Sequence, residues 1–475
     1  MNNTTKPTVI VGGGFVGLFT ALHLGHHRHE EPVILIDPNE SFAFKPLLYE
    51  RLTGEMQNDQ VFPRYEDLLV GRDVTFVQDK VTDLDLEQHR VELASGSHYD
   101  YRYLVLGIGS TQGYLGTEGA KENAFAFRTK EDTIALEKHL RSCLKKATQA
   151  QPERRKELLT VAVVGAGPSG VEMAATLADL LPTWYKELGG NFEDIQIVLI
   201  NHSNQILKGD ANSHLQETAF DALLNRTVPV KFLLGAKVTK VTSDRLEYQL
   251  KDEDDTKILQ AKTTVWTAGT ANNPLIENLP IADENRDKHG LPLVDSTLQL
   301  PNFPGVFAAG DCAVVQDRSY APLAQIAYQE GANIAKNIIA LSKNKELHPV
   351  EASMRGTLMK LGIRNGVANL FDKVKVNGRA GDMIRNVTYL EMLPTPAHDF
   401  VATEEWLSEE IFNRYHKPAP AGEQKPKSQP KSSPSKGLVS IAVGFLLGIM
   451  AIGGLVTIQR AITPDQPATN PQQSE

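Results

Sequence analysis

Residues 8–37 read TVIVGGGFVGLFTALHLGHHRHEEPVILID and are the segment most informative about the fold. Its first four residues, 8–11, are all β-branched and predict a short buried strand. Three glycines then follow at the spacing G-x-G-x-x-G, at positions Gly12, Gly14 and Gly17. Residues 16–24 have helical periodicity, and a second apolar run, 33–36, ends at Asp37, about 20 residues after the last glycine. This order predicts a βαβ unit that binds an adenine dinucleotide.

Each feature of such a unit has a physical role here. Gly12 permits a tight turn, Gly14 lets the backbone approach a pyrophosphate, and Gly17 lets the helix pack closely on the strand. The start of the helix offers free N–H groups and the positive end of its dipole to phosphates. Asp37 stands where a carboxylate binds the ribose.

A second stretch repeats the pattern. Residues 161–164 predict a strand and residues 171–181 a helix. The glycines between them keep the same spacing and are Gly165, Gly167 and Gly170. The paired strand, 195–200, ends at Asn201 followed by a histidine, where an acid would bind a 2′-hydroxyl and repel a 2′-phosphate. Asn201 would not repel the 2′-phosphate, so NADPH can bind here. No arginine adjoins it to favour NADPH over NADH, and the choice between the two nucleotides stays open.

Three further strands are predicted to end in turns of small or acidic residues, at 104–110, 264–269 and 305–311. Gly109 and Gly269 suit a backbone that passes close to a cofactor. Asp311 can bind a sugar-like polyol, or it can cap a helix, and the two roles are compatible.

The remaining segments predict elements around these units. Residues 74–77, 91–93 and 99–103 predict antiparallel strands inserted in the first unit. Residues 131–147 predict an amphipathic helix in which Cys143 is a structural thiol, and residues 148–156 predict a polar linker.

A later helix carries Gln325 and Gln329, four residues apart and therefore on one face. These amides can bind a carbonyl ligand, and by geometry alone solvated glutamines are an equal alternative. The apolar segment 42–50, which follows the second strand of the first unit, suits either a flavin ring or a core.

Composition excludes several classes of protein. The formal net charge of the 475 residues is −9, which argues against nucleic acid as the main partner. Two cysteines without a C-x-x-C exclude a disulfide framework and a cysteine-ligated iron–sulfur cluster, and they indicate a reducing compartment. The polar N-terminus, residues 1–7, shows no signal peptide. Four histidines near the end of the first helix lack a carboxylate pattern, and no metal site is predicted.

The C-terminal region predicts a membrane anchor. Residues 417–436 combine prolines, lysines and serines, as in an extended linker. Residues 437–458 are uncharged and apolar, which predicts one transmembrane helix over 437–459, followed by a polar tail at 460–475. The lysines before this span place the large domain on the cytoplasmic side and favour anionic lipid headgroups. Gly444 and Gly448 form a G-x-x-x-G step that is compatible with pairing of two spans.

Together these motifs resemble the two-dinucleotide-binding flavoprotein oxidoreductases over residues 8–340. Within that group the chain is similar to the type II NAD(P)H:quinone oxidoreductases, on three segments: FKPLLY at 44–49, VGAGPSGVE at 164–172 and AQIAYQ at 324–329. The segments WTAG, AYQE and YLEMLPTP are similar to the cyanobacterial and plastid subgroup, whose members reduce plastoquinone or demethylphylloquinone.

The resemblance implies an α/β fold with two Rossmann-like domains, like that of glutathione reductase, and an α+β C-terminal region associated with the membrane. It implies FAD in the first domain, contacted by Lys45, Pro46, Asp311 and Ala324, and NADH or NADPH as substrate in the second. Glu172 is expected near the nicotinamide and the flavin, Gln325 and Gln329 at the quinone pocket, and a homodimer is possible.

The predicted organisation follows from these assignments: an FAD-binding domain in two parts (1–115 and 271–345), an NAD(P)H-binding domain (155–270), a C-terminal domain (346–416), and the linker, span and tail described above. The predicted activity is non-proton-pumping electron transfer from NAD(P)H through FAD to a membrane quinone. Two alternatives stay open, a flavoprotein reductase with a soluble acceptor and a membrane-tethered NAD(P)H redox sensor.

Overall fold

The computed structural model describes residues 6–209, 211–318, 320–354, 356–370 and 374–394. The predicted linker, transmembrane helix and tail, and residues 395–416 of the predicted C-terminal domain, lie outside this part of the chain. Across the described ranges, no helix combines the length and the apolar content that a membrane crossing needs.

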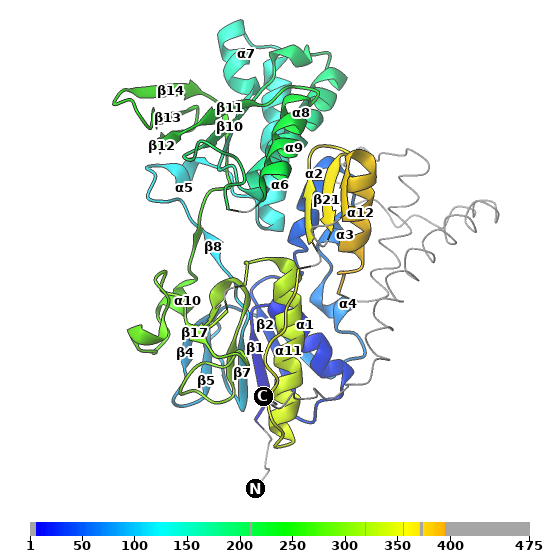
Figure 1. Ribbon diagram of the computed structural model, residues 1–475, viewed down its shortest axis with the longest axis vertical. Helices are drawn as coiled ribbons and strands as arrows, with labels where there is room; N and C mark the ends of the chain where they lie inside the picture. Colours follow the sequence, from blue (N-terminus) through cyan, green and yellow to red (C-terminus); the bar gives the residue numbers. More distant parts are fainter. Residues whose placement is uncertain (1–5, 210, 319, 355, 371–373, 395–475) are drawn as a thin grey trace, which may run out of the picture. The chain divides into compact units, whose positions relative to one another are not determined.

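A five-stranded sheet is built around the first glycine fingerprint, in the order β18-β7-β1-β2-β3. Its strands β1, β2 and β7 are labelled in Figure 1. Its strands are β1 (Thr8–Val11), β2 (Val33–Asp37), β3 (Val74–Gln78), β7 (Tyr103–Leu106) and β18 (Val306–Ala308). All neighbours in it pair in parallel, so the predicted βαβ unit is confirmed. The prediction that residues 74–77 form an antiparallel strand is wrong, because Val74 pairs in parallel with Val33 at the edge of this sheet.

Two helices cover this sheet together. Helix α1 (Phe15–His26) and helix α11 (Ala324–Ser342) pack side by side although about 300 residues separate them, and the Thr20 hydroxyl of α1 donates to the carbonyl of Gly331 in α11 at 3.0 Å. Gly331 permits this approach, since a Cβ there would lie 2.5 Å from the carbonyl oxygen of Val16. The late segment therefore completes the first domain.

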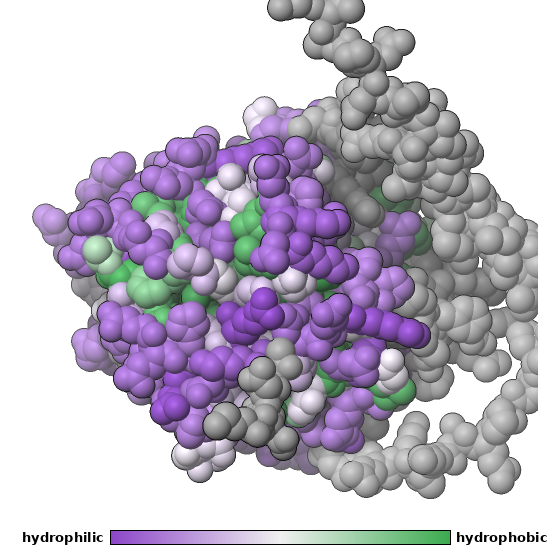
Figure 2. Space-filling view, turned by 90° about the horizontal axis from the view of Figure 1, so that it is seen from below, coloured by the Kyte–Doolittle hydropathy of each residue, from purple (hydrophilic) through white to green (hydrophobic). Residues whose placement is uncertain are grey.

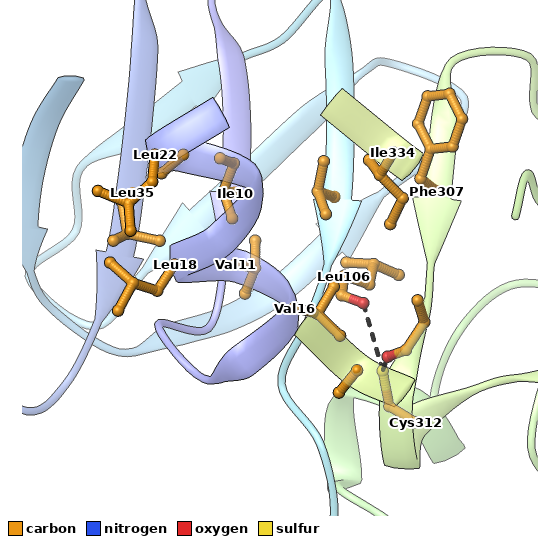
Figure 3. Packing of buried hydrophobic residues seen from close by; sticks show 14 of the residues in the cluster. Ile10, Val11, Val16, Leu18, Leu22, Leu35, Leu106, Phe307, Cys312 and Ile334 are labelled. Carbon is orange, nitrogen blue, oxygen red and sulfur yellow. Dashed lines mark hydrogen bonds between the residues drawn. The ribbon is translucent and has the colours of Figure 1, made fainter. Parts of the chain in front are cut away.

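Figure 3 shows the core of this domain, where Ile10, Val16, Leu106 and Ile334 converge from β1, α1, β7 and α11. Cys312 is buried among them, and its thiol donates to the carbonyls of Leu106 and Ala309 at 3.3 and 3.1 Å. Burial raises the pKa of the Cys312 thiol to about 12. Cys312 is thus a packed core residue.

The second glycine fingerprint begins another parallel sheet, in the order β11-β10-β9-β15. Its strands are β9 (Thr160–Val164), β10 (Gln196–Asn201), β11 (Lys231–Leu234) and β15 (Thr263–Trp266). The helices of this part are α6 (Lys130–Ala147), α7 (Pro152–Leu159), α8 (Pro168–Glu187) and α9 (Ser213–Leu224). An antiparallel sheet adjoins it, made of β12 (Ala236–Val241), β13 (Arg245–Leu250) and β14 (Thr256–Gln260).

The prediction of a linker at 148–156 is wrong in its second half. Helix α7 starts there with Pro152 in its first turn, where a missing N–H and a fixed φ favour helix initiation. The helix ends at Leu158 and Leu159, which are buried in the hydrophobic core of the second domain. Its first residues are polar, and for that reason the sequence pattern predicts a linker. The predicted helix at 131–147 is confirmed as α6, in which Cys143 is buried and free.

The chain leaves the first sheet after β7 and returns after β15, and these two crossings pair as the antiparallel strands β8 (Thr111–Gln112) and β16 (Thr270–Ala271). A three-stranded antiparallel sheet follows α11, with β20 (Gly356–Lys360), β21 (Gly366–Leu370) and β22 (Val374–Asn377), and helix α12 (Gly378–Leu390) packs on it. This α+β unit was predicted in outline.

The smaller elements complete the described chain. The short helices are η1 (Lys45–Leu47), α2 (Leu48–Thr53), α3 (Asn58–Val61), α4 (Tyr65–Leu68), α5 (Ala120–Asn123), η2 (Phe192–Asp194), α10 (Pro274–Glu277), η3 (Asp283–Asn285) and η4 (Gly310–Cys312). The remaining strands are β4 (Val81–Asp85), β5 (Arg90–Leu93) and β6 (His98–Asp100), which form an antiparallel sheet, and the parallel pair β17 (Leu293–Val294) and β19 (Val314–Val315). Figure 2 shows a face that is mostly hydrophilic, with hydrophobic residues in small areas between hydrophilic ones.

Candidate functional site

The first glycine turn leaves open space and unused donors at the start of α1. Gly12 has φ +94°, and a Cβ on Gly17 would lie 1.9 Å from the Gly12 carbonyl oxygen, so both positions require glycine. At Gly14 the nearest atom to an added Cβ is the Gly107 carbonyl oxygen, at 3.6 Å. Helix α1 has no side-chain cap and no acidic residue in its first turn, so its N–H groups and dipole are available to an anion.

Asp37 supports this turn directly. Its Oδ2 accepts a hydrogen bond from Gly13 N at 2.7 Å, and its Oδ1 accepts from the backbone and side chain of Asn39 at 2.8 and 2.9 Å. Burial raises the pKa of Asp37, and these hydrogen bonds oppose the rise. The Tyr65 hydroxyl donates to the Gly13 carbonyl at 2.9 Å, which sequence reasoning missed because Tyr65 lies on a separate short helix.

A polar group lies where β7 and β18 end. Ser110 Oγ donates to Asp311 Oδ2 at 2.9 Å, and Arg128 Nη2 donates to Ser110 Oγ and to its carbonyl at 2.9 and 3.0 Å. Gly109 has φ +63° with open space around an added Cβ. Asp311 lies inside the single turn η4, and the N-cap residues are Ala309 for η4 and Leu323 for α11, so Asp311 caps neither. The backbone N–H of Gly310 donates to Glu330 Oε2 at 2.9 Å.

Lys45 is close enough to this group to interact with its charges. Lys45 is exposed as a residue. Desolvation of its ammonium by the surrounding protein lowers its pKa, and the positive charge of Arg128 lowers it further. The negative charge of Asp311 opposes this shift. Pro46, beside it in η1, accepts a hydrogen bond from Arg385 Nη2 at 2.8 Å through its carbonyl. Arg128 is a further candidate that no motif indicated.

The second glycine turn has the same construction. Gly165 has φ +104°, and a Cβ on Gly170 would lie 1.8 Å from the Gly165 carbonyl oxygen. Helix α8 starts after Gly167 with no side-chain cap and no acid in its first turn. Asn201 Oδ1 accepts a hydrogen bond from Ala166 N at 3.3 Å, which matches the bond between Asp37 and Gly13 in the first unit. Gly269, after β15, has φ +76° and lies against Leu115.

Glu172 of α8 enters a buried network of charges. Its Oε1 accepts a hydrogen bond from Lys360 N at 2.7 Å and lies 3.8 Å from Arg385 Nη2. Burial raises the pKa of Glu172 to about 7, against the lowering effect of Arg385. The carboxyl is therefore close to half ionised at neutral pH, a condition that suits proton exchange.

The rest of this network joins three elements. Lys360 Nζ contacts Glu50 Oε1 at 2.9 Å and Glu55 Oε2 at 2.7 Å, and Arg385 Nη1 contacts Glu50 Oε1 at 2.6 Å. Lys360, Glu50 and Arg385 are each at most 1% exposed. Sequence reasoning missed these residues, because partners more than 300 positions apart leave no spacing signal; a lysine and a glutamate within apolar runs were the available hint.

Gln325 and Gln329 share a face of α11, as predicted, and their side chains hydrogen-bond to the first residue of β20 and to the segment before it. Gln325 Nε2 donates to the Gly356 carbonyl at 3.2 Å. Gln329 Nε2 donates to the Ser353 carbonyl at 3.0 Å, and Ser353 N donates back to Gln329 Oε1 at 3.2 Å. Ala324 is the first residue of the helix, and the N-cap residue before it, Leu323, makes no side-chain capping hydrogen bond.

The first glycine turn, the polar group at Ser110, Arg128 and Asp311, and the space at Gly14 and Gly109 fit a flavin dinucleotide in the first domain. Anion donors meet a pyrophosphate there, and hydroxyl and carboxylate groups meet a polyol. Within the described residues, no set of three or more His, Cys, Asp or Glu side chains is arranged to hold a metal; His29, from the histidine cluster, pairs with Glu31 at 2.7 Å.

The family model "Pyridine nucleotide-disulphide oxidoreductase" matches residues 6–331. The chain is 30% identical over 443 residues to the alternative NAD(P)H-ubiquinone oxidoreductase C1, chloroplastic/mitochondrial, of Arabidopsis thaliana, covering 86% of this chain and 81% of that protein. It is 30% identical over 419 residues to the demethylphylloquinone reductase NdbB of Synechocystis sp., covering 86% of this chain and 97% of that protein.

Among solved structures, NDH2 from Plasmodium falciparum in complex with NADH matches with a TM-score of 0.77 over 87% of this chain and 100% of that chain, at 20% identity, which shows a common fold. The family model spans most of the chain, and both relatives reach 30% identity over most of their length. The chain therefore belongs to the pyridine nucleotide-disulphide oxidoreductase family and, within it, to the type II NAD(P)H:quinone oxidoreductases.

Proposed function

We propose that this protein is a non-proton-pumping NAD(P)H:quinone oxidoreductase that uses FAD and reduces a membrane quinone. The observation that carries the proposal is the pair of glycine turns, each at the end of a parallel strand and each leading into a helix without a cap. Two dinucleotides can therefore bind to one chain. The names of the relatives, ubiquinone and demethylphylloquinone reductases, support a quinone as the acceptor.

In this proposal the segments 1–115 and 271–345 form the FAD-binding domain and 155–270 the NAD(P)H-binding domain. Residues at the first glycine turn, with Asp37, bind the adenosine diphosphate part of FAD, and Asp311 binds its polyol chain. Lys45, Pro46, Gly109 and Ala324 border the flavin ring. When bound, FAD would accept hydride from NAD(P)H and pass two electrons to the quinone.

The chain itself binds the nucleotide, orients it and exchanges protons. Gly165, Gly167 and Gly170 bind the pyrophosphate of NAD(P)H at the start of α8, and Gly269 borders the nucleotide. Glu172, whose pKa is about 7, holds a proton at its carboxyl oxygen and releases or accepts it at neutral pH. Gln325 and Gln329 border the quinone and, through Ser353 and Gly356, fix the wall of its pocket.

The same proposal places the enzyme on a membrane. Residues 437–459 are the predicted transmembrane helix, joined by the linker 417–436, with the catalytic part of the chain on the cytoplasmic side. The uncharged composition of residues 437–458 and the lysines before them support it. A homodimer is part of the proposal and rests on the resemblance alone.

The test is anaerobic rapid mixing of FAD-loaded full-length protein with NADH or NADPH and then with a naphthoquinone or a benzoquinone. We expect rapid bleaching of the flavin absorbance, followed by rapid return when quinone is added. Bleaching without reoxidation by any quinone would overturn the quinone assignment and leave a reductase with a soluble acceptor. The absence of bleaching with either nucleotide would overturn the donor site.

A further inference from the structure

The turn that follows β10 is held against the second glycine turn. Asn201 Nδ2 donates to the carbonyls of Ser203 and Gln205 at 3.3 and 2.9 Å, while its Oδ1 accepts from Ala166 N. Leu207 N donates to the Ala166 carbonyl at 2.7 Å. The Asn201 amide is therefore engaged with the backbone on both sides, and it positions the segment after β10 beside the nucleotide turn.

A neighbouring strand reaches the same place. Gly235 N donates to the Ser203 carbonyl at 3.2 Å, and Lys251 N donates to the Gly235 carbonyl at 2.9 Å. These bonds bring Lys251, which follows β13, next to the turn at 202–205 although it is distant in sequence. The result is a surface pocket of about 340 Å³, lined by His202, Ser203, Asn204, Gln205, Lys208 and Lys251.

The pocket has a positive lining. Two of the six residues are lysines, one is a histidine, and none is a carboxylate. Both lysines are exposed, and within the described part of the chain neither Lys208 nor Lys251 forms a salt bridge with another residue. At the equivalent place of the first unit stands the carboxylate of Asp37, which would repel a phosphate. The lining of this pocket therefore carries lysines where the first unit has the carboxylate of Asp37.

We propose that this pocket binds the 2′-phosphate of NADPH, with Lys208 and Lys251 as its cationic partners and His202 as a third donor, and that NADPH is the preferred electron donor. In a βαβ nucleotide fold, the end of the second strand is where the ribose 2′ position is recognised. Because a phosphate carries close to two negative charges, two mobile ammonium groups bind it well as point charges. The proposal rests on the proposed function for the identity of the donor, since it names which nucleotide the second domain takes.

The first test measures binding by calorimetry, using 2′,5′-ADP and 5′-AMP with the full-length, FAD-loaded protein. We expect the wild type to bind 2′,5′-ADP at least about tenfold more tightly than 5′-AMP, a difference of about 1.4 kcal/mol. The double variant Lys208→Gln/Lys251→Gln should lose that preference and bind 5′-AMP as before. Added salt should weaken 2′,5′-ADP binding in the wild type more than in the variant.

The matched control is Lys231→Gln, an exposed lysine at the other end of β11 that does not line the pocket. The variant Lys208→Arg/Lys251→Arg should keep the preference, which separates charge from a structural effect. Equal wild-type binding of the two nucleotides, or equal weakening of both in the double variant, would overturn the proposal. Binding needs no acceptor, so a protein that prefers 2′,5′-ADP but reduces no quinone would refute the proposed function and leave this inference standing.

A kinetic test completes the design. Rates of flavin bleaching by NADPH and by NADH are compared in the wild type and in His202→Glu, which places a carboxylate in the pocket. We expect the ratio of the NADPH to the NADH rate at low nucleotide concentration to fall at least about tenfold in this variant. An unchanged ratio would contradict the assignment of the pocket.

Discussion

Glu172 illustrates how much the fold changes a single residue. Its carboxyl lies among Lys360, Arg385 and Glu50, and burial raises its pKa from 4.5 to about 7. Between these two values the folded protein holds a proton that the unfolded chain has released. Stability therefore falls as the pH rises from about 5 to about 8, because the folded state binds more protons over that interval.

We predict that Glu172→Gln removes this pH dependence. From pH 5 to pH 8 the wild type should lose up to about 3 kcal/mol more stability than the variant, since one pKa unit corresponds to about 1.4 kcal/mol. Apparent melting temperatures at the two pH values measure the effect, with the exposed Glu87→Gln as control. If both variants follow the wild-type pH dependence, the carboxyl of Glu172 is ionised in the folded protein at pH 5.

A substitution at Gly14 can test cofactor binding without disturbing the fold. A Cβ at this position would meet only the Gly107 carbonyl oxygen, at 3.6 Å, which is ordinary contact. It would, however, occupy the space in front of the N-terminus of α1. We predict that Gly14→Ala folds with an unchanged circular dichroism spectrum but is purified with less than about a tenth of the wild-type FAD, since a methyl group at the phosphates removes several kcal/mol of binding.

The comparison variant is Gly17→Ala, whose Cβ would lie 1.9 Å from the Gly12 carbonyl oxygen. This variant should lose both FAD and thermal stability, because α1 must move away from β1. Full FAD content in Gly14→Ala would show that the pyrophosphate does not approach this backbone.

At the scale of elements, Lys360 connects α2, β20 and α12. Burial by itself would lower the pKa of Lys360, but Glu50 and Glu55 outweigh it and keep the ammonium charged. We predict that Lys360→Met destabilises the protein by about 3–5 kcal/mol, because it leaves the buried carboxylate of Glu50 with one cation fewer. Thermal unfolding of the FAD-loaded protein measures this loss.

The control variant is Lys375→Met, which replaces an exposed lysine on β22. Its melting temperature should equal that of the wild type. The positive charge of the Lys360 ammonium also lowers the pKa of Glu172. Lys360→Met should therefore also alter the pH profile of quinone reduction, whereas Lys375→Met should not. Equal melting temperatures for the two variants would mean that the ion pairs contribute no net stability.

For the whole molecule, the sequence predicts a large folded part and a C-terminal membrane anchor. We predict that removal of residues 437–475 releases the protein from membranes, because about 22 apolar residues are lost that can span the bilayer core. The truncated protein should appear in the soluble fraction after carbonate washing and keep its flavin bleaching by NADPH. Retention in the membrane fraction would assign the attachment to another part of the chain.

The two nucleotide turns could be predicted from the sequence alone, because glycine spacing, strand composition and helix periodicity are local properties of consecutive residues. For the same reason it predicted β1, α1, β2, β9, α8 and α11, and it placed Gln325 and Gln329 on one face. It failed at residues 74–77, where strand direction depends on a partner elsewhere, and at α7, where only two leucines pack.

The contacts between charges that are distant in sequence became known from the three-dimensional structure. The contacts of Lys360 with Glu50 and Glu55, of Arg128 with Ser110, and of Lys251 with the turn after β10 join segments that share no motif. A sequence shows which residues are charged. The pKa of Glu172 follows from its burial and from charged neighbours that the fold brings close, and the positive charge of the pocket at Lys208 follows from the residues that the fold places around it. Electrostatic energy depends on distance in space and on the exclusion of water, and neither is a property of position along the chain.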